Sequence, residues 1–275
     1  MSDKELTLDF PPVSYDQWKA SVLAELKGAP FEKKLVTRTL DGIDIQPLST
    51  AADWPSDGDP SGFPGLLPLT RGSQPLGHAV AGWDIRQEHT HPDPAEANKT
   101  IVEDLEHGVT SIQLRLDAAA CAGLDADSRE ATELAGRDGV MAYSLGDFES
   151  LLRGVHLDIA PVALDAGAAF LPAATILAAL LRRRKLDSAT VRCAFNADPL
   201  GTLMSEGHLP VPLDVALAQM ADLAAWTAGN YPNATAIEVN TGAYHHAGAT
   251  STQDLAFAVA KILRVGRFFA LPSPH

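Results

Sequence analysis

The sequence predicts an α/β protein in which a parallel sheet is covered by helices. Over most of the 275-residue chain, short apolar segments alternate with longer segments of helical periodicity. The clearest unit is a strand, a capped helix and a second strand in direct succession, at a length that implies a parallel, right-handed crossover. These two observations predict parallel strands that lie inside a layer of helices.

The first strand of this unit is predicted over residues 81–87. Its side chains alternate, so that Trp83 and Ile85 lie on one face and Asp84 and Arg86 on the other. This alternation predicts that the charged side chains lie on the concave, inner face of the curved sheet and that the apolar side chains contact the helices on the outer face.

The helix that follows has a complete start signal. Asp93 is an N-cap residue, Pro94 suits the first helical position, and Glu96 completes a capping box. Gly108 ends the helix, and residues 111–116 form the second strand. The same alternation continues to the end of the chain. Further strands are predicted at 156–159, 190–196 and 234–240, and further helices at 147–153, 167–184 and 212–228, with a last helix opened by Ser251 and Asp254.

The N-terminal part of the chain has a different organisation. A capping box of Ser14 and Gln17 predicts a helix that ends at Gly28, and alternation around Asp41-Gly42 predicts a short hairpin within residues 35–47. The predicted domains are an N-terminal arm and linker over 1–65, extended over 1–13 and looped over 51–65, and a sheet domain over 66–275.

Composition excludes several classes of function. A net charge of −14 excludes nucleic acid as a partner, because phosphate binding needs a basic surface. The most apolar run, 166–181, contains Pro172 and is short for a membrane span, so no membrane association is predicted. The polar, acidic start is no signal peptide and the two cysteines form no disulfide framework, which together predict a cytoplasmic protein.

Three stretches carry a resemblance to a known family. They are Trp18 to Thr50, the run of Thr-Arg-Gly at 70–72 with Trp-Asp-Ile-Arg-Gln at 83–87 and the strand at 111–117, and Tyr244 to Phe257. In this order and spacing they resemble the methylmalonyl-CoA mutase family, which interconverts acyl-CoA skeletons by radical chemistry on adenosylcobalamin. The resemblance implies a (β/α)8 TIM barrel. Five βα units are present where a closed barrel needs eight, so a partial TIM barrel is predicted.

The resemblance also implies positions for a site. Thr70, Arg71 and Arg86 match substrate-binding positions of the family, and Tyr244 and His245 match the Tyr-His pair of catalytic members. These five residues are the candidate site residues.

The chain departs from the family pattern at two further positions. Ala81 stands at the arginine that helps to grip coenzyme A, and Glu88 stands at the tyrosine beside the reacting radical. A carboxylate cannot replace a tyrosine hydroxyl donor, and it repels a carboxylate of the substrate. The family's cobalt-ligand motif, Asp-x-His-x-x-Gly, is absent from the sequence. The pairs His89/His91 and His245/His246 are interpreted as loop histidines, since no metal-ligand spacing accompanies them.

The resulting prediction is a chain like the small, non-catalytic subunit of a methylmalonyl-CoA mutase-like enzyme. It would support a catalytic, cobalamin-binding large subunit in a heterodimer and bind no cofactor alone. One alternative is a catalytically active acyl-CoA mutase, of methylmalonyl-CoA/succinyl-CoA or isobutyryl-CoA type, with a divergent site. Another is a pseudoenzyme fragment with a binding role. Acyl-CoA is a weaker expectation as a partner, because the inward face is charged.

That inward face predicts a lumen closed by ion pairs. Some of the predicted inward positions are charged. The positive ones are Arg86, Arg115 and Arg192, and the negative ones are Asp84, Glu88, Asp117, Asp158 and Glu238. Buried charges must pair, and arginine suits carboxylates in bidentate geometry. If the pairs are buried, removal of Arg115 should cost about 3–5 kcal/mol.

Overall fold

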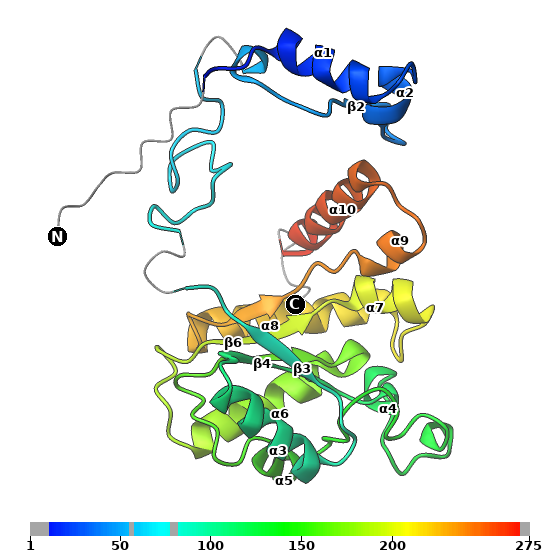
Figure 1. Ribbon diagram of the computed structural model, residues 1–275. Coiled ribbons are helices and arrows are strands. Elements are labelled where there is room, and N and C mark those ends of the chain that lie inside the picture. Colours follow the sequence, from blue (N-terminus) through cyan, green and yellow to red (C-terminus); the bar gives the residue numbers. More distant parts are fainter. Residues whose placement is uncertain (1–10, 55–57, 78–81, 270–275) are drawn as a thin grey trace, which may run out of the picture. The chain divides into compact units, whose positions relative to one another are not determined.

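The computed structural model describes residues 11–54, 58–77 and 82–269, and the chain divides into two compact units, Met1–Gly82 and Trp83–His275 (Figure 1). Each unit is described by itself. The predicted domain boundary after residue 65 stays a prediction, and the extended arm predicted over 1–13 falls largely outside the described residues.

The first unit is built from short local elements. Its helices are α1 (Tyr15–Glu25) and α2 (Phe31–Leu35), its strands β1 (Thr37–Arg38) and β2 (Asp44–Ile45), and a 3-10 turn covers Ala51–Asp53. The predicted capping box is confirmed, because the Gln17 amide donates to Ser14 Oγ at 3.2 Å and the Ser14 amide donates to Gln17 Oε1 at 2.9 Å. The predicted hairpin is confirmed as well, since β1 and β2 pair antiparallel and Gly42 has a φ of +80° in the turn.

The second unit contains a five-stranded parallel sheet. Its strands are β3 (Arg86–His89), β4 (Ser111–Arg115), β5 (Val162–Asp165), β6 (Cys193–Ala197) and β7 (Thr235–Ile237). They lie side by side in sequence order, and each adjacent pair is parallel. Parallel strands in sequence order with helices between them build the wall of a (β/α)8 barrel. The predicted α/β fold with part of a TIM barrel is therefore confirmed.

Helices follow every strand of this sheet. The longer ones are α3 (Pro94–Glu106), α5 (Leu145–Leu151), α6 (Phe170–Arg183), α7 (Pro199–Glu206), α8 (Leu213–Asn230) and α10 (Ser251–Phe269), and the short ones are α4 (Ala118–Cys121) and α9 (Gly242–His246), with 3-10 turns at Arg129–Ala131 and Gly167–Ala169. Figure 1 shows α3, α5 and α6 together along one face of the sheet. The predicted N-cap of α3 is confirmed, because Asp93 accepts from the amides of Ala95 and Glu96 at 2.7 and 3.0 Å. The Glu96 half of the predicted capping box is not confirmed, since the Glu96 carboxylate accepts from Lys99 Nζ at 2.7 Å.

The core lies between the sheet and these helices. Ile112, Leu114 and Phe195 are fully buried on the helix-facing side of the strands, because alternate side chains of a strand point to the same face. Helices contribute the opposite half of the same core, through Ile101, Phe148, Leu177 and Leu217. Burying such side chains removes apolar surface from water and is the main source of stability.

Two strand predictions are wrong in position. Residues 156–159 form a turn, closed by a 2.9 Å hydrogen bond from the Ala160 amide to the His156 carbonyl, and the strand is β5, a few residues later. Polar and apolar residues alternate from His156 to Ile159, as they do in a half-buried strand, and this pattern caused the wrong prediction. The true strand is buried nearly throughout and reads as a short apolar run, as central parallel strands do.

The first strand is also displaced. Residues 82–85 have no regular secondary structure, and β3 begins at Arg86. Trp83 and Ile85, which were expected to face helices, are exposed, and Ala81 lies outside the described residues. Backbone pairing with β4, through Arg86 opposite Ser111, decides where this strand begins.

Candidate functional site

Polar side chains gather where β4 to β7 end, around a cavity of about 340 Å³. Arg115 and Asp165 are the last residues of β4 and β5, Asn196 lies near the end of β6, and Glu238 and Asn240 follow β7. Parallel α/β folds bind ligands at the carboxyl ends of their strands. This cavity is therefore the candidate functional site.

An ion pair crosses the sheet at this cavity. Arg115 and Asp165 lie directly opposite each other on β4 and β5, and Arg115 Nη1 is 3.1 Å from Asp165 Oδ2. The Arg115 Nε also donates to the Asp138 carbonyl at 3.1 Å. The two side chains of the pair are 44% and 36% exposed. The expectation of a lumen closed by buried ion pairs is thus wrong for Arg115, because the interior of this sheet stays open to water.

The sequence also assigned the wrong role to Asp117. Its carboxylate is fully buried, but it caps α4 instead of joining an arginine in the lumen. Oδ1 accepts from the Ala120 amide at 3.1 Å and from the Tyr143 hydroxyl at 2.6 Å, and Oδ2 accepts from the Gly136 amide at 2.7 Å. Asp117 therefore fixes the loop after β4, which forms one wall of the site.

One buried ion pair lies at the cavity and was not predicted. Lys261 of α10 is 5% exposed, and its Nζ lies 2.6 Å from Asp198 Oδ2 and 2.6 Å from the Asn240 carbonyl. Asp198 also accepts from the amides of Gly201 and Asn240, each at 2.8 Å. A single lysine thereby joins α10 to the ends of β6 and β7.

Burial shifts the pKa values of several groups around the cavity. It raises the pKa of Glu238, and the nearby carboxylates of Asp198 and Asp165 raise it further. Burial likewise raises the pKa of Asp165, although Arg115 opposes that shift. Burial, with a smaller contribution from Asp165, raises the pKa of Cys121 to about 12, so this thiol stays protonated at neutral pH and is a poor nucleophile.

The predicted catalytic pair lies on α9. The Tyr244 ring stacks on Phe257 of α10, with 4.1 Å between ring centroids and 14° between planes. His245 is exposed, with its ring centroid 5.9 Å from that of His246. Of these three α9 residues, His246 lines the cavity. Catalytic use of Tyr244 and His245 remains a prediction.

The predicted substrate-binding residues fall in both units. Arg86 of β3 donates from Nε to Ser111 Oγ at 3.1 Å, and its Nη2 is 3.5 Å from Asp84 Oδ2. Thr70 and Arg71 belong to the first unit, where Thr70 Oγ1 donates to the Ser61 carbonyl at 2.5 Å. The contacts of these three residues are structural ones, and their role toward a substrate stays a prediction.

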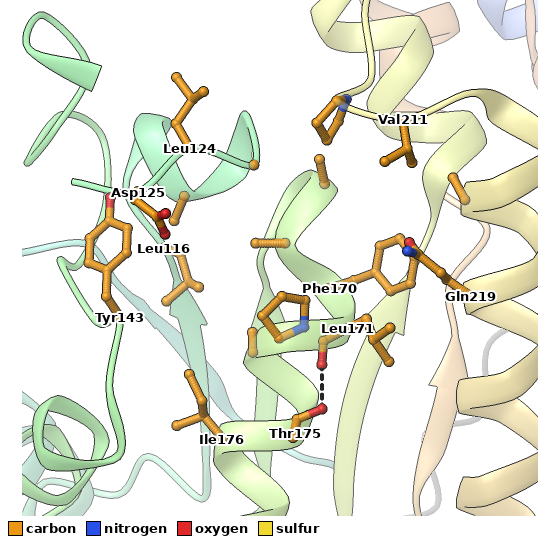
Figure 2. Close-up of a pocket in the computed structure, with 18 of the residues that line it drawn as sticks. Leu116, Leu124, Asp125, Tyr143, Phe170, Leu171, Thr175, Ile176, Val211 and Gln219 are labelled. Atoms are coloured by element: carbon orange, nitrogen blue, oxygen red, sulfur yellow. Dashed lines mark hydrogen bonds between the residues drawn. The ribbon is translucent and has the colours of Figure 1, made fainter. Parts of the chain in front are cut away.

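A second, larger cavity of about 640 Å³ has a different character. Figure 2 shows its mainly apolar lining, with Leu116, Phe170, Ile176 and Val211 among the labelled side chains. The lining includes the start of α6, where Thr175 Oγ1 donates to the Leu171 carbonyl at 2.8 Å. Asp125 and Tyr143 are the titratable side chains of its lining, whereas several carboxylates, an arginine and a histidine line the cavity at the strand ends. The larger cavity is therefore the poorer candidate for acid–base chemistry.

Within residues 11–54, 58–77 and 82–269, no three His, Cys, Asp or Glu side chains are grouped so as to hold a metal ion. Over the same residues, no helix combines the length and the apolar character that crossing a membrane requires.

The second unit has parallel strands in sequence order, helices after each strand, and polar residues at the strand ends. These features place the protein in the class of α/β proteins built on part of a TIM barrel. Residues 38–265 match the family model described as methylmalonyl-CoA mutase. The chain belongs to the methylmalonyl-CoA mutase family.

Several curated relatives are similar to most of this chain. The methylmalonyl-CoA mutase small subunit of Streptomyces virginiae is 34% identical over 262 residues, which cover 93% of this chain and 38% of the relative. The small subunit of Propionibacterium freudenreichii subsp. shermanii is 29% identical, with 92% and 36% covered. The large subunit of Streptomyces virginiae is 26% identical, with 94% and 35% covered. The chain spans little more than a third of the length of these relatives.

Proposed function

We propose that this chain is a small-subunit-type partner of a methylmalonyl-CoA mutase large subunit and has no mutase activity of its own. Similarity to two small subunits supports the subunit type. Ala81 and Glu88, at positions where catalytic members use an arginine and a tyrosine, support the lack of activity. In this proposal the large subunit binds adenosylcobalamin and this chain binds none.

The observation that carries the proposal is the charge of the cavity at the strand ends. Its lining includes four carboxylates, those of Asp165, Asp198, Glu206 and Glu238. The two strong cations at hand, Arg115 and Lys261, are already paired with carboxylates. An acyl-CoA carries phosphates and, in these substrates, a carboxylate, so such a cavity repels it.

The cytoplasm is the proposed compartment. Cys121 and Cys193 are both free thiols, at least partly buried, in the described structure. Free thiols persist in reducing compartments, where disulfides rarely form.

Mixing this chain with the large subunit of Streptomyces virginiae tests the partnership. In sedimentation velocity we expect a faster boundary that contains both polypeptides, with a dissociation constant of about 1 μM or lower at 150 mM salt. An unrelated protein of similar size and acidity is the control, since the chain's net charge of −14 could produce weak, salt-sensitive association. Two independent boundaries at 10 times that concentration, about 10 μM, would exclude the partnership.

A further inference from the structure

The larger, apolar cavity is separate from the candidate functional site. Neighbouring residues line the two cavities: Arg115 and Gly167 belong to the polar cavity, and Leu116 and Ala168 to the apolar one. Among the described residues, none lines both cavities. A ligand of the apolar cavity would therefore occupy a site of its own, on the other side of these two chain segments.

The fold itself sets the walls of this cavity. Asp117 holds the loop after β4 by accepting from the Gly136 amide and from the hydroxyl of Tyr143, which is part of the lining. Across the cavity, Gly123 approaches the loop before α8 so closely that a Cβ at this position would lie 2.7 Å from Pro210 Cγ. A glycine with a φ of +78° permits this approach. Walls fixed in this way are typical of pre-formed ligand pockets.

The size and lining of the cavity suit a small organic molecule. Its volume of about 640 Å³ lies within the range of roughly 300–1,000 Å³ that ligand pockets span. Leu116, Phe170, Ile176 and Val211 are among its mainly apolar side chains (Figure 2). Such a lining favours an apolar ligand body, because binding removes apolar surface of both partners from water.

One polar side chain of the lining has no hydrogen-bond partner. Gln219 of α8 is half-buried, and it makes no hydrogen bond with any residue that the structure describes. Figure 2 shows its side chain reaching from α8 toward the other lining residues. The Thr175 hydroxyl, by contrast, already donates to the Leu171 carbonyl. An amide side chain offers both a donor and an acceptor, so a neutral amide on a ligand can form two hydrogen bonds with Gln219.

The charge of the lining favours an uncharged ligand. Among the described lining residues there is no lysine, arginine or histidine, so a carboxylate or phosphate would lose its hydration without gaining a counter-charge. Asp125 is the charged side chain of the lining, and it is exposed. Water screens the attraction of an exposed carboxylate for an ammonium group, so a cation gains little here.

We propose that the apolar cavity binds a small uncharged molecule with an aliphatic body and one amide group. The body would pack against Phe170 and Ile176, and the amide group would exchange hydrogen bonds with Gln219. This site goes beyond the proposed function, because it lies apart from the cavity at the strand ends and needs no large subunit.

Titration of the full 275-residue chain with octanamide, followed by amide NMR spectra, tests the inference. We expect one saturable site with a dissociation constant of about 1 mM or lower, which a ligand of about 10 non-hydrogen atoms can reach in a good pocket. The side-chain amide signals of Gln219 should shift in the same titration. Octanoate has the same size but carries a negative charge, and it should bind about 10-fold more weakly or worse.

Two variants locate the site. Val211→Trp fills part of the cavity and should weaken octanamide binding about 10-fold or more. Its matched control is Val215→Trp, at a valine of α8 that is 40% exposed and outside the lining, and this variant should bind as the unchanged chain does. Gln219→Leu keeps the apolar contacts but removes the hydrogen bonds, and it should weaken binding about 5-fold or more.

The same spectra show whether each variant is folded. If Val211→Trp does not fold, Gln219→Leu and the octanoate comparison still decide. The inference would be overturned by the lack of a saturable shift up to about 10 mM octanamide, or by equal affinity for octanoate. Unchanged binding in Gln219→Leu, or a loss in Val215→Trp as large as in Val211→Trp, would overturn it too. None of these outcomes depends on binding of the large subunit.

Discussion

Replacing Lys261 by alanine is expected to lower the free energy of unfolding by about 3–5 kcal/mol. Lys261 and Asp198 are both buried, and their 2.6 Å contact is charge-assisted. Without the lysine, the carboxylate of Asp198 would keep two backbone amides as donors but lose its counter-charge. Urea unfolding followed by circular dichroism measures the loss, which should appear as a lower midpoint at an unchanged m-value.

The exposed pair at the same cavity supplies the control. Arg115→Ala removes an ion pair whose two side chains are each more than a third exposed, so the expected loss is no more than about 1 kcal/mol. A loss for Lys261→Ala as small as this would mean that water reaches Asp198. A loss for Arg115→Ala near 3 kcal/mol would restore the closed lumen that the sequence alone predicted.

Asp117→Ala is expected to destabilise the second unit by about 3–5 kcal/mol. The buried Ala120 amide and the half-buried Gly136 amide and Tyr143 hydroxyl would lose their acceptor, and each buried donor left unsatisfied costs about 1–3 kcal/mol. The Tyr143 hydroxyl would keep its proton in this variant, because burial, the largest cause of its raised pKa, persists without Asp117.

Asp93→Ala is the matched comparison for this variant. Asp93 also caps a helix and accepts from two backbone amides, but it is exposed, so water can replace the lost acceptor. Its loss should cost about 1 kcal/mol. Equal effects of the two substitutions in urea unfolding would contradict the role given to the buried carboxylate.

Local signals predicted much of the fold. The caps formed by Ser14 and Asp93 were readable because both partners of each hydrogen bond lie within three residues of each other. Strand β5 was misplaced because a strand buried nearly throughout loses the alternation by which strands are recognised. The helix α7 was missed although Asp198 and Pro199 carry a cap and a first-turn proline.

The site was less predictable than the fold. Lys261 and Asp198 are 63 residues apart, and no local pattern links them. The sequence around Lys261 has the pattern of an ordinary amphipathic helix. This pattern does not indicate that the lysine is buried or that apolar side chains such as Leu255 and Ile262 are exposed. Parity along the first strand did predict that Glu88 faces inward, and Gln113 Nε2 of the neighbouring strand β4 donates to its Oε2 at 3.1 Å. How deeply the inward side chains are buried depends on how strongly the sheet curves toward a closed barrel. The alternation of side chains along a strand does not predict that curvature.

The most direct measurement of the central claim is turnover by the purified chain. Methylmalonyl-CoA and adenosylcobalamin would be added to this chain alone and, in parallel, to the large subunit of Streptomyces virginiae with and without it. We expect no succinyl-CoA above the blank from this chain alone, because a cavity rich in carboxylates and the replacements at positions 81 and 88 leave it without the groups that hold the substrate. Turnover by the chain alone, abolished by His245→Ala, would contradict the claim and make this chain a catalytic mutase.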